Sequence, residues 1–166
     1  MSLYAIAVPT FTRSLTSLRN ILVKGEAHAE AKGIDPAVLV NGRLAPDMFP
    51  LKRQVQITTD SARRGCGNLT GKEVPVIEDT EETFAELIAR VDAALAYIGD
   101  FTESDFAGAE EKVIELPLAS GTLKLDGTTF LMSFAMANFS FHLTTAYNIL
   151  RHNGVELGKM DYLGAP

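Results

Sequence analysis

Asn138 and His142 are the residues whose types and spacing could do chemistry in this chain. They lie four positions apart in a segment with helical periodicity, so they share one helix face, about 40° apart on a helical wheel. Ile149 lies about 20° from Asn138 on the same wheel, which marks this face as core-facing. A buried amide and a buried imidazole need a partner, a metal or a ligand. We therefore expect a polar site inside the fold.

Three roles are open for His142. It could be a buried side chain hydrogen-bonded to Asn138, to Gln54 or to a carbonyl, a contact for a ligand without metal, or a metal ligand. Gln54 lies at the edge of the apolar stripe of an earlier helix, where it could be a hydrogen-bonding group or a catalytic group. His152 is about 15 Å further along the helix axis, so it cannot share a metal with His142. Nothing in the sequence places His28.

Other reactive side chains also have two interpretations. Cys66 lies on the same apolar stripe, either as a packed small hydrophobe or as a nucleophile. Asp47 is either a helix cap or a general base. The pair Arg63–Arg64 is expected on a solvated face. No phosphate-binding glycine loop, HExxH, CxxC or GxSxG string is present, so no catalytic residue is assigned.

Composition and charge restrict the class of protein. A length of 166 residues with 46% apolar content predicts a single domain over 1–166. The net charge of -6 argues against a nucleic-acid partner. No run of about 18 apolar residues is present, and the apolar start is broken by Pro9 without a preceding basic residue, so we expect neither membrane span nor signal peptide. The single cysteine favours the cytoplasm.

Hydrophobic periodicity predicts four long helices. The first covers 3–23 and is followed by a short helix or an offset continuation over 25–33. A brief helical turn over 36–40 is capped by Asp35. The second long helix follows 43–50, with Asp47 as its cap and Pro50 within its first turn.

The rest of the chain predicts two more long helices and a hairpin. The third helix is capped at Asp79–Thr80 and ends near Gly99, and a small hairpin follows over 113–126. The fourth helix runs from Thr128 or Thr129 to His152. The expected fold is an all-α antiparallel four-helix bundle, and the long loop before the fourth helix would allow a non-sequential order.

Two aromatic side chains lie outside the core arc of the last helix. Phe134 and Phe141 recur seven positions apart on one flank. This apolar flank could pack on the hairpin or form a subunit interface. We expect a homodimer.

Three long strings make the chain similar to a known group of proteins. They are 43–48 leading to Gln54, 138–142 and 147–159. With them the chain resembles the DinB/YfiT-like superfamily of four-helix proteins, and within it an uncharacterised bacterial family known only as a domain of unknown function. The resemblance covers nearly the whole chain and implies the DinB-like bundle.

The resemblance also implies a metal site that this chain has altered. Members of the superfamily often bind a divalent metal through one histidine of the second helix and an i, i+4 pair on the last helix, and some are metal-dependent thiol transferases or isomerases. His142 fits the second member of that pair, so it is the best single metal candidate. Asn138 holds the first position, and Gln54 is the nearest inward polar residue of the second helix. The donor set is therefore degenerate, although a divalent metal stays open as a cofactor.

The functional expectation is a binding protein. We expect a small ligand or a partner in a polar pocket between the second and fourth long helices, lined by Gln54, Asn138 and His142. The alternative is a divalent-metal-dependent small-molecule transferase acting on thiols, or a related enzyme.

Overall fold

The fold is mostly helical, with one small hairpin, as the sequence predicts. The computed structural model describes residues 2–118 and 121–164. The long helices are α1 (Leu3–Lys32), α3 (Leu51–Thr70), α4 (Phe84–Gly99) and α6 (Met136–His152). The shorter elements are α2 (Pro36–Val40), the 3-10 turn η1 (Glu103–Phe106), β1 (Val113–Leu118), β2 (Gly121–Asp126), α5 (Gly127–Thr129), the π-helical segment η2 (Phe130–Ala135) and α7 (Lys159–Leu163).

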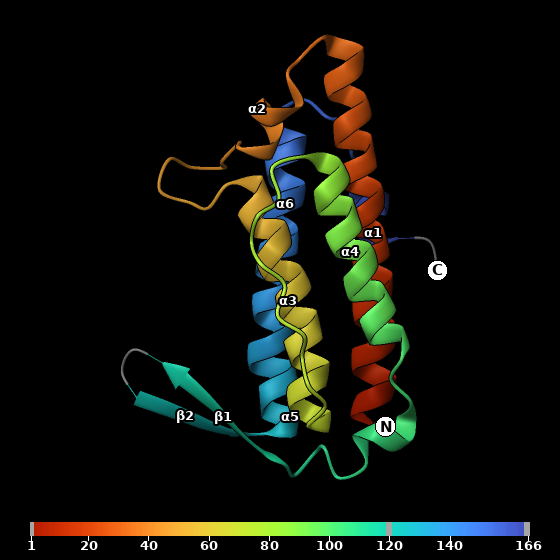
Figure 1. Cartoon of the computed structure of the whole chain (residues 1–166), viewed down its shortest axis with the longest axis vertical. Coiled ribbons are helices and arrows are strands. Elements are labelled where there is room, and N and C mark those ends of the chain that lie inside the picture. Colours follow the sequence, from red (N-terminus) through yellow and green to blue (C-terminus); the bar gives the residue numbers. More distant parts are fainter. Residues whose placement is uncertain (1, 119–120, 165–166) are drawn as a thin grey trace.

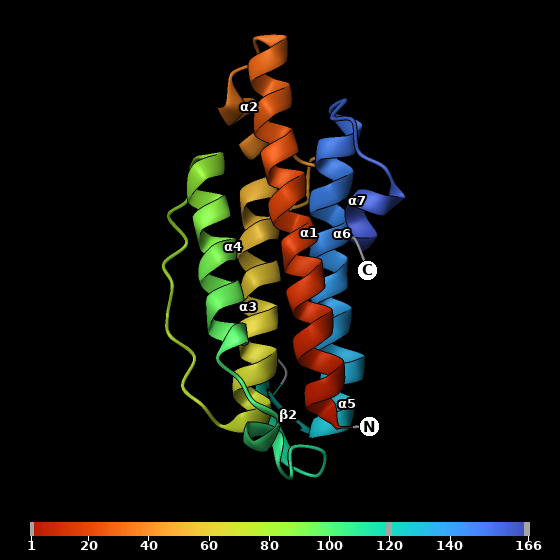
Figure 2. The same ribbon diagram turned by 90° about the vertical axis from the view of Figure 1, so that its right-hand side faces the viewer.

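The four long helices lie side by side with two chain directions (Figures 1 and 2). α1 and α6 run upward in Figure 1, whereas α3 and α4 both run downward. The connection over 71–83 returns along α3 to the upper end, which explains the parallel pair. Its extended length of about 40 Å exceeds the roughly 30 Å of α3. The expectation of antiparallel packing throughout is therefore corrected for α3 and α4.

α1 is a single helix of 30 residues, so of the two alternatives for 25–33 it is the continuation of the predicted helix over 3–23 that the structure contains. It continues through Gly25 because this glycine is a packing position. A Cβ atom there would lie 3.1 Å from Phe84 and from Leu150, so the missing side chain lets α4 and α6 approach. Pro9 lies inside the helix on its exposed side, and Gly33 ends it in the left-handed conformation with φ 64°.

Two predicted helix caps are wrong. α3 begins after Pro50, whose side chain cannot accept a capping hydrogen bond, and Asp47 is not its cap. α4 is capped by Thr83, in a capping box with Glu86, and not by Asp79–Thr80. The Asp79 carboxylate pairs with arginines instead, so tertiary electrostatics take precedence over local capping at this position.

The last helical stretch agrees with the prediction over 128–152. Asp126 caps α5 by accepting a hydrogen bond from Thr129 N, and η2 and α6 continue the helical path. Asn153 and Gly154, with φ 91°, end α6. Before it, the predicted hairpin is present, with Val113 opposite Asp126, and it projects from the lower end of the helices (Figure 1).

The core lies between the long helices and is apolar. Phe11 of α1 and Phe139 of α6 meet edge to face with ring centroids 5.0 Å apart. In the described part of the chain, no helix is both long enough and apolar enough to cross a membrane.

Candidate functional site

The imidazole of His142 is held by a side-chain amide on the neighbouring helix. Its Nδ1 lies 2.7 Å from Oε1 of Gln54, and both side chains are buried. Gln54 Nε2 donates to the carbonyl oxygen of Phe49 at 3.0 Å, which fixes the amide with Oε1 toward the histidine. Since Oε1 only accepts, Nδ1 must carry the proton and donate it. The other nitrogen, Nε2, then has a free lone pair.

The surroundings of His142 favour its neutral form. Burial lowers the pKa of His142, and the positive charge of Arg53 lowers it further. A neutral imidazole with Nδ1 bound to an amide presents Nε2 as a hydrogen-bond acceptor. The buried hydrogen-bonding role and the ligand-contacting role are therefore compatible, because they use different nitrogens.

Asn138 also contacts α3, but at Ser61, further along this helix than Gln54. Its Nδ2 donates to Ser61 Oγ at 2.7 Å, and the side chain is exposed, which corrects the expectation of a core-facing amide. Asn138 lies at the edge of the buried arc of α6, whose centre near Ala146 is about 80° away. The structure thus brings all three predicted residues to the α3–α6 contact, with only Gln54 and His142 bonded to each other.

His142 and Asn138 line a groove of about 700 Å³. Gln54 is not among the lining residues and lies behind the imidazole. Helix α3, the crossover 71–83, β1, η2 and α6 all contribute walls. The remaining lining residues are Arg53, Ile57, Asp60, Ser61, Arg64, Gly65, Asn68, Asp79, Glu115, Leu116, Pro117, Phe130, Phe134 and Ala135.

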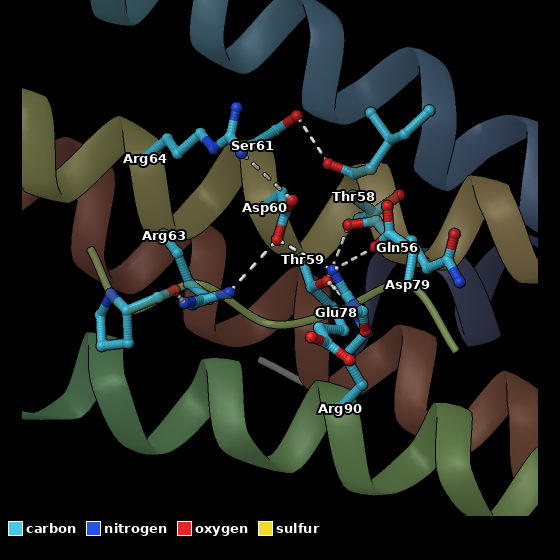
Figure 3. A network of polar contacts seen from close by, with 12 residues as sticks. Gln56, Thr58, Thr59, Asp60, Ser61, Arg63, Arg64, Glu78, Asp79 and Arg90 are labelled. Atoms are coloured by element: carbon cyan, nitrogen blue, oxygen red, sulfur yellow. Dashed lines mark hydrogen bonds and ion pairs between the residues drawn. The ribbon is translucent and has the colours of Figure 1, made fainter. Parts of the chain in front are cut away.

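A buried arginine network lies beside the groove (Figure 3). The guanidinium of Arg90 on α4 is 1% exposed and donates to Thr59 Oγ1 at 3.0 Å and to the Glu78 carbonyl at 3.1 Å. It also pairs with the carboxylates of Glu81 at 2.9 Å and of Asp60 and Asp79, each at 3.0 Å. The network ties α4, α3 and the crossover together.

Sequence reasoning missed this network, although a signal was present. Arg90 lies three positions after Leu87 and four before Ala94, on the apolar stripe of α4. A cation at such a position must find buried partners. Arg63 is also buried, bonded to Asp60 and the carbonyl of Pro75, so its predicted solvated position is wrong, whereas Arg64 is exposed as expected.

The available donors do not fit a transition-metal site. In residues 2–118 and 121–164 no three His, Cys, Asp or Glu side chains form a group that could hold a metal ion. Nδ1 of His142 and Oε1 of Gln54 bind each other, and Asn138 is bonded to Ser61. The charge of Arg53 beside the imidazole would also repel a cation. His142 Nε2 alone is left as a nitrogen ligand, which is too few for zinc.

Two further candidate residues lie away from the groove lining. Cys66 is buried on α3, and burial raises the pKa of its thiol to about 12, so it packs as a small hydrophobe. His28 belongs to α1. Neither side chain contributes to the groove.

Comparison with known proteins identifies the family of this chain. The sequence profile of a family described as "Domain of unknown function (DUF1993)" matches residues 3–163. The chain belongs to the DUF1993 family. A crystal structure of a DinB family member protein from Shewanella denitrificans matches it with a TM-score of 0.94 and 48% sequence identity, over 99% of this chain and 93% of that one. The DinB-like resemblance is confirmed. No curated protein matches the chain.

Proposed function

We propose that this DUF1993 protein binds a small organic molecule in the groove between α3 and α6, without a resident metal. The observation that carries the proposal is the Nε2 lone pair of His142, on a buried imidazole oriented by Gln54 at the groove wall. An acceptor that is held in place at the wall of a groove is suited to a hydrogen-bond donor on a ligand. His142, which the family resemblance would assign to a metal, would then bind an organic ligand.

The π-helical segment η2 supports the proposal. A π turn is rare, and where it occurs it is frequently at a functional site. Three residues of η2, namely Phe130, Phe134 and Ala135, line the groove. Phe130 and Phe134 stack with ring centroids 6.1 Å apart, which gives the groove an aromatic wall.

A small-molecule screen tests the proposal. Tag-free protein is screened by thermal shift, and hits are titrated against the wild type, His142→Ala and His152→Ala. Loss of the imidazole should abolish binding and lower stability by roughly 1–3 kcal/mol, because Gln54 loses a buried partner. His152→Ala is the matched control, since His152 is exposed at the end of α6. Hits that bind both variants equally contradict the proposal.

Elemental analysis of the same preparations tests the alternative. A stoichiometric divalent metal that is present in the wild type and in His152→Ala but lost in His142→Ala would favour the metal-dependent thiol transferase. We expect no stoichiometric metal whose binding depends on His142.

A further inference from the structure

We infer that the ligand of this groove is a monoanionic organic carboxylate, which Arg64 pairs with at one end and His142 binds through a donor group at the other. The inference rests on the proposed binding function and names its ligand class. It is carried by the charge pairing around the groove, the apolar wall and the spacing of the two polar ends.

Arg64 is the cation that the groove leaves without a close partner. Its Nη2 lies 3.7 Å from Asp60 Oδ2, and its side chain is 69% exposed. Asp60 is closer to Arg90, at 3.0 Å, and to Arg63, at 3.2 Å. These two guanidiniums are buried, so they cannot turn to solvent and release Asp60. Arg64 can therefore exchange its long contact for a ligand at little cost.

The remaining groove charges are matched by close partners. Arg53 pairs with Asp79, and Glu115 pairs with Lys124 at 2.7 Å. Together with Glu81, the third carboxylate around Arg90, the lining charges and their ion-pair partners hold one more cation than carboxylates. A surplus of one charge suits a carboxylate better than a phosphate dianion, and a guanidinium fork suits the two oxygens of a carboxylate. The cations are Arg53, Arg63, Arg64, Arg90 and Lys124, and the carboxylates are Asp60, Asp79, Glu81 and Glu115.

The groove also has an apolar wall. Gln54, which holds His142, and Arg64 lie about 15 Å apart along the axis of α3. The aromatic side of η2 and the β1 residues Leu116 and Pro117 line the same groove. An elongated molecule with a donor at one end, an apolar middle and a carboxylate at the other would match these three features.

Three related probes separate the contributions of charge and donor. Phloretate carries a phenolic donor and a carboxylate, phloretamide replaces the carboxylate by a neutral amide, and hydrocinnamate lacks the phenol. Each is titrated by ligand-observed NMR against the wild type, Arg64→Gln, His142→Gln and Arg151→Gln. Arg64 and Arg151 are both exposed, and Arg151 at the end of α6 is the matched control.

We expect phloretate to bind the wild type at least about tenfold more tightly than phloretamide or hydrocinnamate, the difference that one lost charge-assisted contact makes. Arg64→Gln should reduce phloretate binding to the level of phloretamide and leave phloretamide unchanged. His142→Gln should reduce phloretate binding to the level of hydrocinnamate, and Arg151→Gln should change nothing.

Two results would overturn the inference. Equal binding of phloretate and phloretamide that still depends on His142 would reject the anionic ligand while supporting the binding function. No saturable binding of any probe up to about 10 mM would reject this ligand class. The library screen with His142→Ala then decides separately whether the groove binds small molecules at all.

Discussion

The two nitrogens of His142 have separate tasks in this fold. Nδ1 donates to Gln54 Oε1 and fixes the ring, while Nε2 is the nitrogen that we propose binds the ligand. In a three-histidine metal site the imidazole would need other ligands beside it, but Asn138 and Gln54 offer amides that are already engaged. The amide of Gln54 thus supplies the hydrogen bond that orients the imidazole.

The lowered pKa of His142 makes stability depend on pH in a predictable direction. The unfolded chain binds a proton at this residue as the pH falls through the ordinary value of 6.5, whereas the folded chain resists protonation until the pH reaches its lower pKa. The free energy of unfolding should therefore fall with decreasing pH in that window. Urea denaturation between about pH 5.5 and 8 should show a flatter profile for His142→Gln than for the wild type. An unchanged slope in His142→Gln, with the same slope in His152→Gln, would contradict the assignment.

The crossover 71–83 is the element that sets the order of the helices, and Arg90 holds it in place. The guanidinium contacts α3 and the crossover at once, through Asp60, Asp79, Glu81 and the Glu78 carbonyl. Asp79 and Asp60 also line the groove. The network therefore positions one wall of the proposed binding site as well as the parallel pair α3–α4.

Replacing Arg90 by methionine should be strongly destabilising. The buried Glu81 carboxylate and Asp60 would lose their shared partner, at a cost of about 3–5 kcal/mol in the free energy of unfolding. Arg19→Met is the control, because its pair with Asp92 is exposed on both sides and exposed pairs contribute little to stability. Urea denaturation of both variants measures the difference. Similar losses in the two variants would show that the network holds the crossover no better than a surface pair does.

Elements with strong periodicity were predictable from the sequence, and their tertiary adjustments were not. The range 128–152 follows from its apolar spacing and the Asn153–Gly154 stop, and the structure agrees. The sequence left open whether α1 continues past Gly25, because this glycine marks a close approach of other helices, which only the packed structure reveals. Capping by Thr83 and not Asp79 was missed because Asp79 is recruited by distant arginines.

The candidate site was predictable only in part for the same reason. Helical spacing and family resemblance predicted that Gln54, Asn138 and His142 lie between α3 and α6. The groove walls from β1 and the crossover depend on long-range packing that local patterns do not encode.

At the scale of the whole molecule, the expected homodimer remains a prediction with a definite surface. Phe141 is 57% exposed and meets the His142 ring edge to face at 5.1 Å, and Phe134 is 37% exposed. An aromatic side chain left this open beside a groove is a candidate interface contact. A dimer through this face would place one protomer beside the groove mouth of the other.

Light scattering after gel filtration measures the oligomeric state directly. The wild type should give a mass twice the 18.0 kDa of one chain, and Phe141→Ser should shift it toward the monomer because the apolar contact is lost. Val76→Ser is the control, since Val76 is 92% exposed on the crossover and lies outside the α6 surface. A wild type that stays monomeric at every concentration would reject the homodimer, and a dimer that survives Phe141→Ser would place the interface on another face.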